Sequence, residues 1–125
     1  MKFWFFMLVI NLIFPLTMIC WGKYFIKKAP KEINYIFGYR TTMSMKNKDT
    51  WNFAHHYFGN LWFKLGVITL PICIIVMLFV IGKSQDVIGT VSTILCIIQL
   101  FPIIIPIIPT EIALKKTFDK DGNRL

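Results

Sequence analysis

Three long uncharged stretches dominate the pattern of apolar and polar positions along the chain, at residues 3–22, 65–82 and 87–110. A helix needs roughly 20 apolar residues to cross a hydrocarbon core about 30 Å thick. The second stretch reaches that length when it begins near residue 61, because Lys64 can extend its ammonium group to the interface. The pattern therefore predicts an all-α membrane protein with three transmembrane helices at about 3–22, 61–82 and 87–110.

A further helical segment is predicted to lead into the second span. Asn47 or Asp49 can cap its start. At 100° per residue, polar side chains gather on one face and mainly aromatic ones on the other, which predicts an interfacial amphipathic segment anchored at headgroup depth. The aromatic face holds Trp51, Ala54, Tyr57, Phe58, Leu61 and Trp62, and the polar face holds Asn52, His55, His56, Gly59 and Asn60.

Polar residues and prolines interrupt the apolar stretches. We expect Asn11 to bond to a neighbouring helix or to backbone, as single polar residues in membrane helices usually do. Pro102, Pro106 and Pro109 lie on one face of the third span, where they remove backbone hydrogen bonds that other groups must replace. Gln99 is the nearest candidate for that compensation. A bent, lipid-facing helix end and a functional gate both remain open.

The composition agrees with a single membrane domain over residues 1–125. Hydrophobic residues make up 56% of the chain and the mean hydropathy is +0.63, well above the values of ordinary soluble domains. The first stretch is expected to stay as a membrane helix instead of being cleaved as a signal peptide. It is longer than a signal-peptide core, and no small-x-small cleavage site follows it.

Charge predicts the orientation. The chain carries 14 Lys and Arg against 6 Asp and Glu, a net charge of +8. Most of the basic residues fall in the loop 23–50 and the tail 111–125, whereas Lys2 and Lys83 fall on the opposite side. The positive-inside rule then places the loop and the C-terminus in the cytoplasm and the N-terminus outside. Anionic lipid headgroups are the expected partner of these cations, and nucleic acid is not.

Groups that could support an enzyme or a metal site are scarce. Cys20, Cys73 and Cys96 lie in apolar stretches without CxxC spacing. His55 and His56 are adjacent, so their side chains point about 100° apart and do not form a metal-binding pair. The tail after Asp119 is too short for a calcium loop and predicts a solvated turn. We therefore predict no catalytic residue, no cofactor and no metal.

The polar, basic segment 38–51 is where recognition is most readily encoded. The guanidinium of Arg40 can bind a phosphate, a carboxylate or backbone carbonyls. The alternatives are that the segment ties the loop to helix ends or binds lipid headgroups. The candidate binding or motif residues in and around this segment are Asn34, Gly38, Tyr39, Arg40, Thr41, Ser44, Asn47, Trp51, His55 and Asn60.

These residues resemble the signature of the SdpI family of bacterial membrane proteins. The match is carried by Asn34, Gly38-Tyr39-Arg40-Thr41, Ser44-Met45-Lys46-Asn47, Trp51, Phe53-Ala54 and Gly59. The end of the chain is similar to the C-terminal end of the same family, through Pro109-Thr110-Glu111, Leu114-Lys115-Lys116 and Asp121-Gly122. The resemblance covers roughly residues 33–125.

The resemblance implies a non-enzymatic protein of the bacterial cytoplasmic membrane. Founding members of the family protect cells from a sporulation-delay toxin, although they have additional spans before the motif. We therefore expect protection against a membrane-active peptide toxin, or the holding of a cytoplasmic regulator at the membrane. The alternative is a small transport or permeation subunit, in which Arg40, His55 and Asn60 would line a path in a homo-oligomer. No GxxxG motif indicates an interface for such an oligomer.

Overall fold

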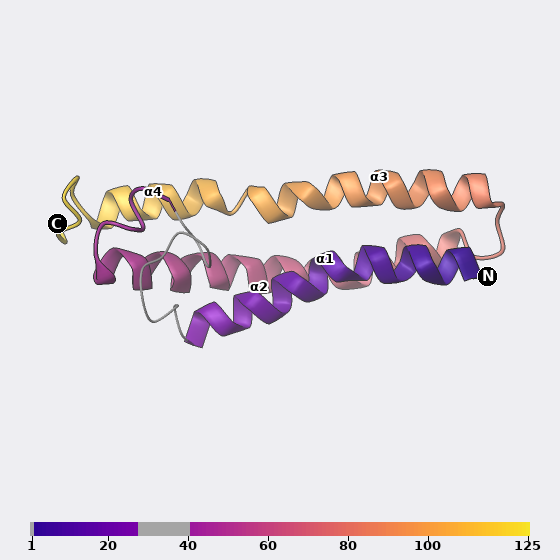
Figure 1. The fold of residues 1–125 in the computed structure, drawn as a ribbon, viewed down its shortest axis with the longest axis horizontal. Coiled ribbons are helices and arrows are strands. Elements are labelled where there is room, and N and C mark those ends of the chain that lie inside the picture. The colour runs from indigo at the N-terminus through magenta and orange to yellow at the C-terminus, as the bar shows by residue number, and fades with distance from the viewer. Residues whose placement is uncertain (1, 28–40) are drawn as a thin grey trace.

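The computed structural model describes residues 2–27 and 41–125, which form four helices (Figure 1). These are α1 (Lys2–Lys27), α2 (Lys48–Phe79), α3 (Gln85–Ile104) and α4 (Ile107–Thr117). Three helical stretches are long and apolar enough to cross a membrane, namely α1, α2 and the combined stretch Gln85–Thr117. The predicted all-α architecture with three spanning helices is confirmed. The predicted interfacial segment is helical too, and it is continuous with the second span in α2.

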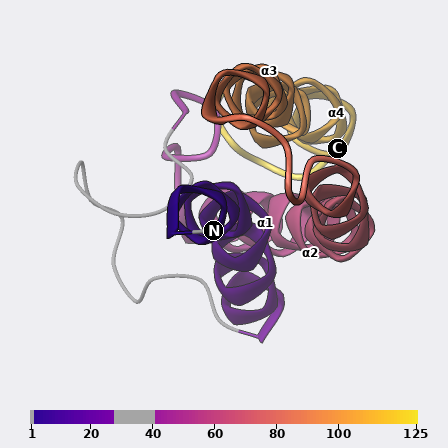
Figure 2. The same ribbon diagram turned by 90° about the vertical axis from the view of Figure 1, so that its right-hand side faces the viewer.

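The helices run up and down along one long axis. Figure 1 shows α2 returning alongside α1, and α3 and α4 returning alongside α2, so that the C-terminal tail ends beside the start of α2. The end view in Figure 2 places α3 and α4 on one side of the α1–α2 pair. The fold thus brings the end of α1, the start of α2, α4 and the tail to the same end of the bundle.

Glycines allow the backbones of α1 and α2 to touch where the two helices cross. A Cβ atom added to Gly22 would lie 2.8 Å from the carbonyl oxygen of Gly59, and one added to Gly59 would lie 2.9 Å from that of Gly22. Two turns further along α2, a Cβ atom added to Gly66 would lie 2.9 Å from the carbonyl oxygen of Pro15. Such close approach maximises van der Waals contact, which replaces the hydrophobic effect as a driving force for helix association in lipid.

An apolar cluster joins the opposite end of the bundle. The indole Nε1–H of Trp4 donates to the carbonyl oxygen of Met77 at 2.7 Å, linking α1 to α2. The buried members of the cluster are Trp4, Cys73, Met77, Val80, Ile88 and Leu95. The outward faces of the helices are also apolar, with Phe79 75% and Phe101 60% exposed. An exposed apolar surface of this extent fits a protein surrounded by lipid.

A cluster of polar side chains ties the three spans together at depth. The Oδ1 atom of Asn11 accepts a hydrogen bond from Nε2 of Gln99 at 3.0 Å and one from Sγ of Cys96 at 3.3 Å. The Oε1 atom of Gln99 accepts from Sγ of Cys73 at 3.1 Å. The prediction that Asn11 bonds to a neighbouring helix is confirmed.

The prolines divide the third span into α3 and α4. Pro106 lies between the two helices and is buried. Gln99, the nearest candidate for replacing the hydrogen bonds that the prolines remove, donates from Nε2 to Asn11, as described above. A carbonyl in the last turn of α3 receives a donor from α2, where the indole Nε1–H of Trp62 bonds to the carbonyl oxygen of Ile103 at 3.1 Å. A side chain far away in the sequence thus satisfies a carbonyl at the break between α3 and α4.

Candidate functional site

The described part of the polar segment, residues 41–47, forms a turn stabilised by its own side chains. The backbone N–H of Thr41 donates to Oγ of Ser44 at 2.8 Å, and the hydroxyl of Ser44 donates to the carbonyl oxygen of Thr41 at 2.9 Å. Ser44 is fully buried. Hydroxyl groups of this kind replace backbone partners where no helix or strand supplies them.

Asn47 begins α2 as its N-cap. Its Oδ1 accepts the backbone N–H of Thr50 at 2.9 Å, and its own backbone N–H donates to Oγ1 of Thr50 at 3.0 Å. The two residues thereby satisfy each other's unpaired amides at the helix start. The prediction that Asn47 caps this helix is confirmed.

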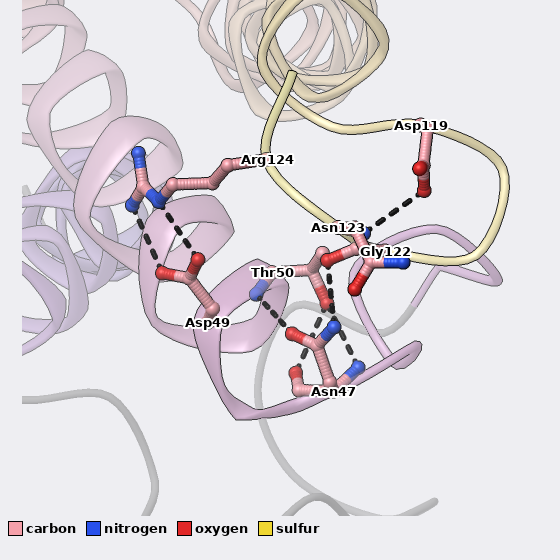
Figure 3. Close-up of polar contacts among 7 residues, drawn as sticks. All are labelled: Asn47, Asp49, Thr50, Asp119, Gly122, Asn123 and Arg124. Carbon is pink, nitrogen blue, oxygen red and sulfur yellow. Dashed lines mark hydrogen bonds and ion pairs between the residues drawn. The ribbon is translucent and has the colours of Figure 1, made fainter.

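The same asparagine binds the C-terminal tail, residues 118–125. Its Nδ2 donates to the carbonyl oxygen of Gly122 at 2.7 Å, as Figure 3 shows. Gly122 has a φ of +86°, a conformation that favours glycine. A Cβ atom there would lie only 2.6 Å from Nδ2 of Asn47 and 2.9 Å from Cβ of Lys46. The start of α2 and the tail therefore pack so closely at Gly122 that there is no room for a side chain.

A bidentate ion pair adds a second link between the tail and α2. Arg124 donates from Nε and from its Nη2 atom to the two carboxylate oxygens of Asp49, at 2.8 and 2.9 Å (Figure 3). The bonds from Arg124 hold the pKa of Asp49 below its ordinary value of 3.8, and the same bonds raise the pKa of Arg124. Both side chains are about half exposed, so the pair gives geometric specificity more than stability.

The tail folds as a turn with an aromatic anchor. The Oδ1 atom of Asp119 accepts the backbone N–H groups of Asp121 and Asn123, both at 2.9 Å. The prediction of a turn in the tail is confirmed. Phe118 is 1% exposed, lies edge-on to Phe53 with ring centroids 5.4 Å apart, and packs in one cluster with the buried residues Ala54, Phe58 and Leu114.

Further along α2, Trp51 and His55 lie inside the bundle. The two rings are 4.2 Å apart, and Phe25 of α1 lies edge-on to His55 at 4.9 Å. The placement of His55 and Gly59 on an exposed polar face is wrong. Both are buried, because α1 packs against that face of α2. Asn60 is exposed, as expected.

The structure thus brings together part of the predicted site. Thr41, Ser44 and Asn47 meet at the start of α2, and the rings of Trp51 and His55 contact each other at a tilt of 50° about one turn further on. Asn60 lies apart from both groups. Asn34, Gly38, Tyr39 and Arg40 lie outside the described residues. Within residues 2–27 and 41–125, no group of three His, Cys, Asp or Glu side chains could hold a metal ion.

The sequence interpretation missed the partner of this segment. The sequence pattern indicates Asp49 as a possible cap and a basic tail, but it does not indicate that Arg124 pairs with Asp49. The spacing of Asp119, Asp121 and Gly122 did indicate a turn, but nothing in the local pattern indicated where the turn would dock. The contact joins positions 75 residues apart, for both the amide bond and the ion pair.

A comparison with known protein families identifies the family to which this chain belongs. The family model described as the SdpI/YfhL protein family matches residues 31–110. The chain belongs to this family. No curated protein and no solved structure matches the chain.

The SdpI/YfhL match includes the capping turn and all of α2 and α3, and it ends inside α4. Membership and the three spanning stretches together make this chain a multi-pass membrane protein of the SdpI type. The tail that docks on Asn47 lies beyond the matched residues. The contact between the tail and α2 is therefore a feature of this structure that the family match does not include.

Proposed function

We propose that this SdpI/YfhL family protein is a non-enzymatic immunity protein that protects a bacterial cell against a membrane-active peptide toxin. It would lie in the cytoplasmic membrane with its N-terminus outside and its C-terminus in the cytoplasm. The distribution of charge supports this orientation. Exposed lysines gather at the end of the bundle where α2 begins, namely Lys23, Lys27, Lys46, Lys48, Lys115, Lys116 and Lys120.

The observation that carries the proposal is the closed polar cluster at depth. Asn11, Gln99, Cys73 and Cys96 bond to one another across three helices. A permeation path needs polar groups that are free to bind the permeating species, and ion or proton coupling usually needs charged groups at depth. The stretches 3–22, 65–82 and 87–110 contain no charged residue. These features favour an immunity protein over a transport subunit.

The outward faces of the helices would then provide the contact with the peptide. Large apolar side chains are exposed on each span, including Phe6 on α1, Ile75 on α2 and Phe101 on α3. A hydrophobic peptide inserted in the same bilayer meets these side chains without any loss of hydration. Its binding would depend on close packing and on lipid displacement.

Challenge of a sensitive bacterium with defined peptides tests the proposal. Cells expressing the wild-type gene are exposed to the sporulation-delay toxin and to a set of other membrane-active peptides, and survival is compared with that of cells carrying an empty vector. We expect higher survival against at least one peptide. The control variant is Gly59→Val, whose side chain would meet Cβ of Phe25 and the carbonyl oxygen of Gly22 and so disturb the α1–α2 crossing. Unchanged survival against every peptide, with wild-type protein at a normal level in the membrane, would refute the proposal.

A further inference from the structure

Four side chains that can donate hydrogen bonds are exposed where α1 and α2 cross, and we call them the donor face. They are those of Lys23, His56, Asn60 and Lys64. Within residues 2–27 and 41–125, no hydrogen bond or ion pair reaches any of the four. α1 contains no acidic residue and α2 contains none after Asp49, so these two helices offer the donor face no carboxylate.

The close approach of two glycines places Lys23 beside Asn60. A Cβ atom added to Gly22 would lie only 2.8 Å from the carbonyl oxygen of Gly59, so the residues that follow these glycines lie at the same level of the helix pair. Each of the two is turned by about 100° from the point of contact. Because α1 and α2 run in opposite directions, both turns lead to the same side of the pair (Figure 1). An ammonium group of α1 and an amide group of α2 therefore share one face.

The donor face points away from the third span. Phe58 precedes Gly59 and Asn60 follows it, so their side chains leave α2 on opposite sides. Phe58 packs in one cluster with Leu114 of α4. Figure 2 likewise places α3 and α4 on one side of the α1–α2 pair. Neither α3 nor α4 therefore covers the donor face.

Depth in the bilayer favours a phospholipid as the acceptor. Lys23 directly follows the uncharged stretch 3–22, and Lys64 directly precedes the uncharged stretch 65–82. The 18 residues of the second stretch span about 27 Å, close to the thickness of the hydrocarbon core. Both ammonium groups therefore lie where hydrocarbon gives way to headgroups, at the level of the lipid phosphates. Asn60 lies one turn further toward the water, about 6 Å along the helix axis.

The chemistry of the donor face favours a lipid with a net negative charge. All four side chains can donate to phosphate oxygens, and the two lysines are cations as well. A zwitterionic lipid brings its own cationic group to the same place, whereas an anionic lipid does not. One turn deeper than Lys64, α2 becomes apolar, and Val67 is 47% and Ile68 56% exposed. An acyl chain that descends from a phosphate at Lys64 meets these side chains.

We propose that the donor face binds an anionic phospholipid. The phosphate lies between Lys23, Asn60 and Lys64, and His56 bonds to the outer part of the headgroup, such as the glycerol hydroxyls of phosphatidylglycerol. The acyl chains follow the apolar side chains of α2 into the bilayer. The site is independent of the immunity function proposed above, since it concerns only the lipid that the protein holds.

Lipid retention by the purified full-length protein tests the site. The protein is reconstituted in vesicles with equal amounts of phosphatidylglycerol and phosphatidylcholine, and is then extracted in a mild detergent. Native mass spectrometry counts the lipids of each kind that stay bound. Lys23→Gln/Lys64→Gln removes both cations of the donor face, and Asn60→Leu removes a donor without changing the charge. The matched control, Lys115→Gln/Lys116→Gln, removes two exposed cations from α4.

We expect the wild type to retain phosphatidylglycerol severalfold over phosphatidylcholine. Both donor-face variants should lose most of this preference, and the control pair should keep it. The substituted side chains are exposed, so circular dichroism should show the same helix content in every variant. The proposal is overturned if the wild type shows no preference or if Asn60→Leu keeps it in full. An equal loss in the control pair would also overturn it, because charge alone would then attract the lipid.

Discussion

Substitution of Gly59 by alanine should separate α1 from α2. The new Cβ atom would lie 2.8 Å from Cβ of Phe25, 2.9 Å from the carbonyl oxygen of Gly22 and 3.1 Å from the backbone nitrogen of Ile26. Carbon atoms normally pack at about 3.5–4.0 Å. The atoms that are met are backbone or Cβ atoms, so no rotamer change relieves the overlap. α1 must therefore shift as a whole.

The expected cost follows from two opposing effects. Forcing an extra methyl group into a packed interface costs about 1–3 kcal/mol, and the upper part of that range applies where backbone must move. Alanine is a better helix former than glycine by about 1 kcal/mol, which offsets part of the cost. We expect Gly59→Ala to lower the free energy of unfolding by about 1–2 kcal/mol.

Unfolding by SDS in mixed micelles, followed by circular dichroism, measures this change. Gly89→Ala is the matched control, because a Cβ there meets only the ring of Phe3, at 3.6 and 3.7 Å, which is ordinary contact. The control should unfold at the same SDS fraction as the wild type or at a higher one. The reasoning is refuted if Gly59→Ala is as stable as the wild type, or if Gly89→Ala is destabilised to the same extent.

Further changes test the docking of the tail on α2 and the contact at the break between α3 and α4. Gly122→Ala should weaken the protection of the tail from hydrogen exchange, since its Cβ would lie 2.6 Å from the side-chain amide of Asn47 and its φ of +86° disfavours alanine. Acid should release the tail: the folded-state pKa of Asp49 is below its unfolded value, so its stabilising contribution is present above pH 3.8 and is lost as the pH falls through the folded-state pKa. Asp49→Asn should abolish that pH dependence of tail exchange without affecting the rest of the bundle. Trp62→Phe should lower the free energy of unfolding by about 1 kcal/mol, because a carbonyl at the break between α3 and α4 loses its donor, and a loss of less than half of that value in the SDS assay would contradict the assignment.

Features encoded by local pattern could be predicted from the sequence. The three spans follow from the lengths of the uncharged stretches, because the bilayer fixes the length that a helix must have. The cap at Asn47 follows from a short polar residue placed just before a helical stretch. The cap depends on a few neighbouring residues, and the spans depend on the known thickness of the bilayer.

Features that depend on which elements meet could not be predicted in the same way. A helical projection separates the faces of α2, but it does not show that α1 covers the face that contains His55 and Gly59. Sequence proximity makes Gln99 the candidate donor near the prolines, but the carbonyl of Ile103 at the end of α3 receives its donor from Trp62, which is 41 residues away. Proximity in sequence is a poor guide where helices 20 or more residues long return alongside one another.

The position of the signature bears on the proposed immunity function. In this structure the described signature residues bond mainly to the chain itself: Ser44 to the turn, Asn47 to Thr50 and to the tail. In the proposed orientation they lie at the cytoplasmic end, whereas a toxin from outside would first meet the opposite end of the bundle. These residues would then contribute to immunity by joining α2 to the tail and not by contacting the toxin. Asn47→Ala should accordingly reduce immunity only as far as it reduces the amount of folded protein in the membrane.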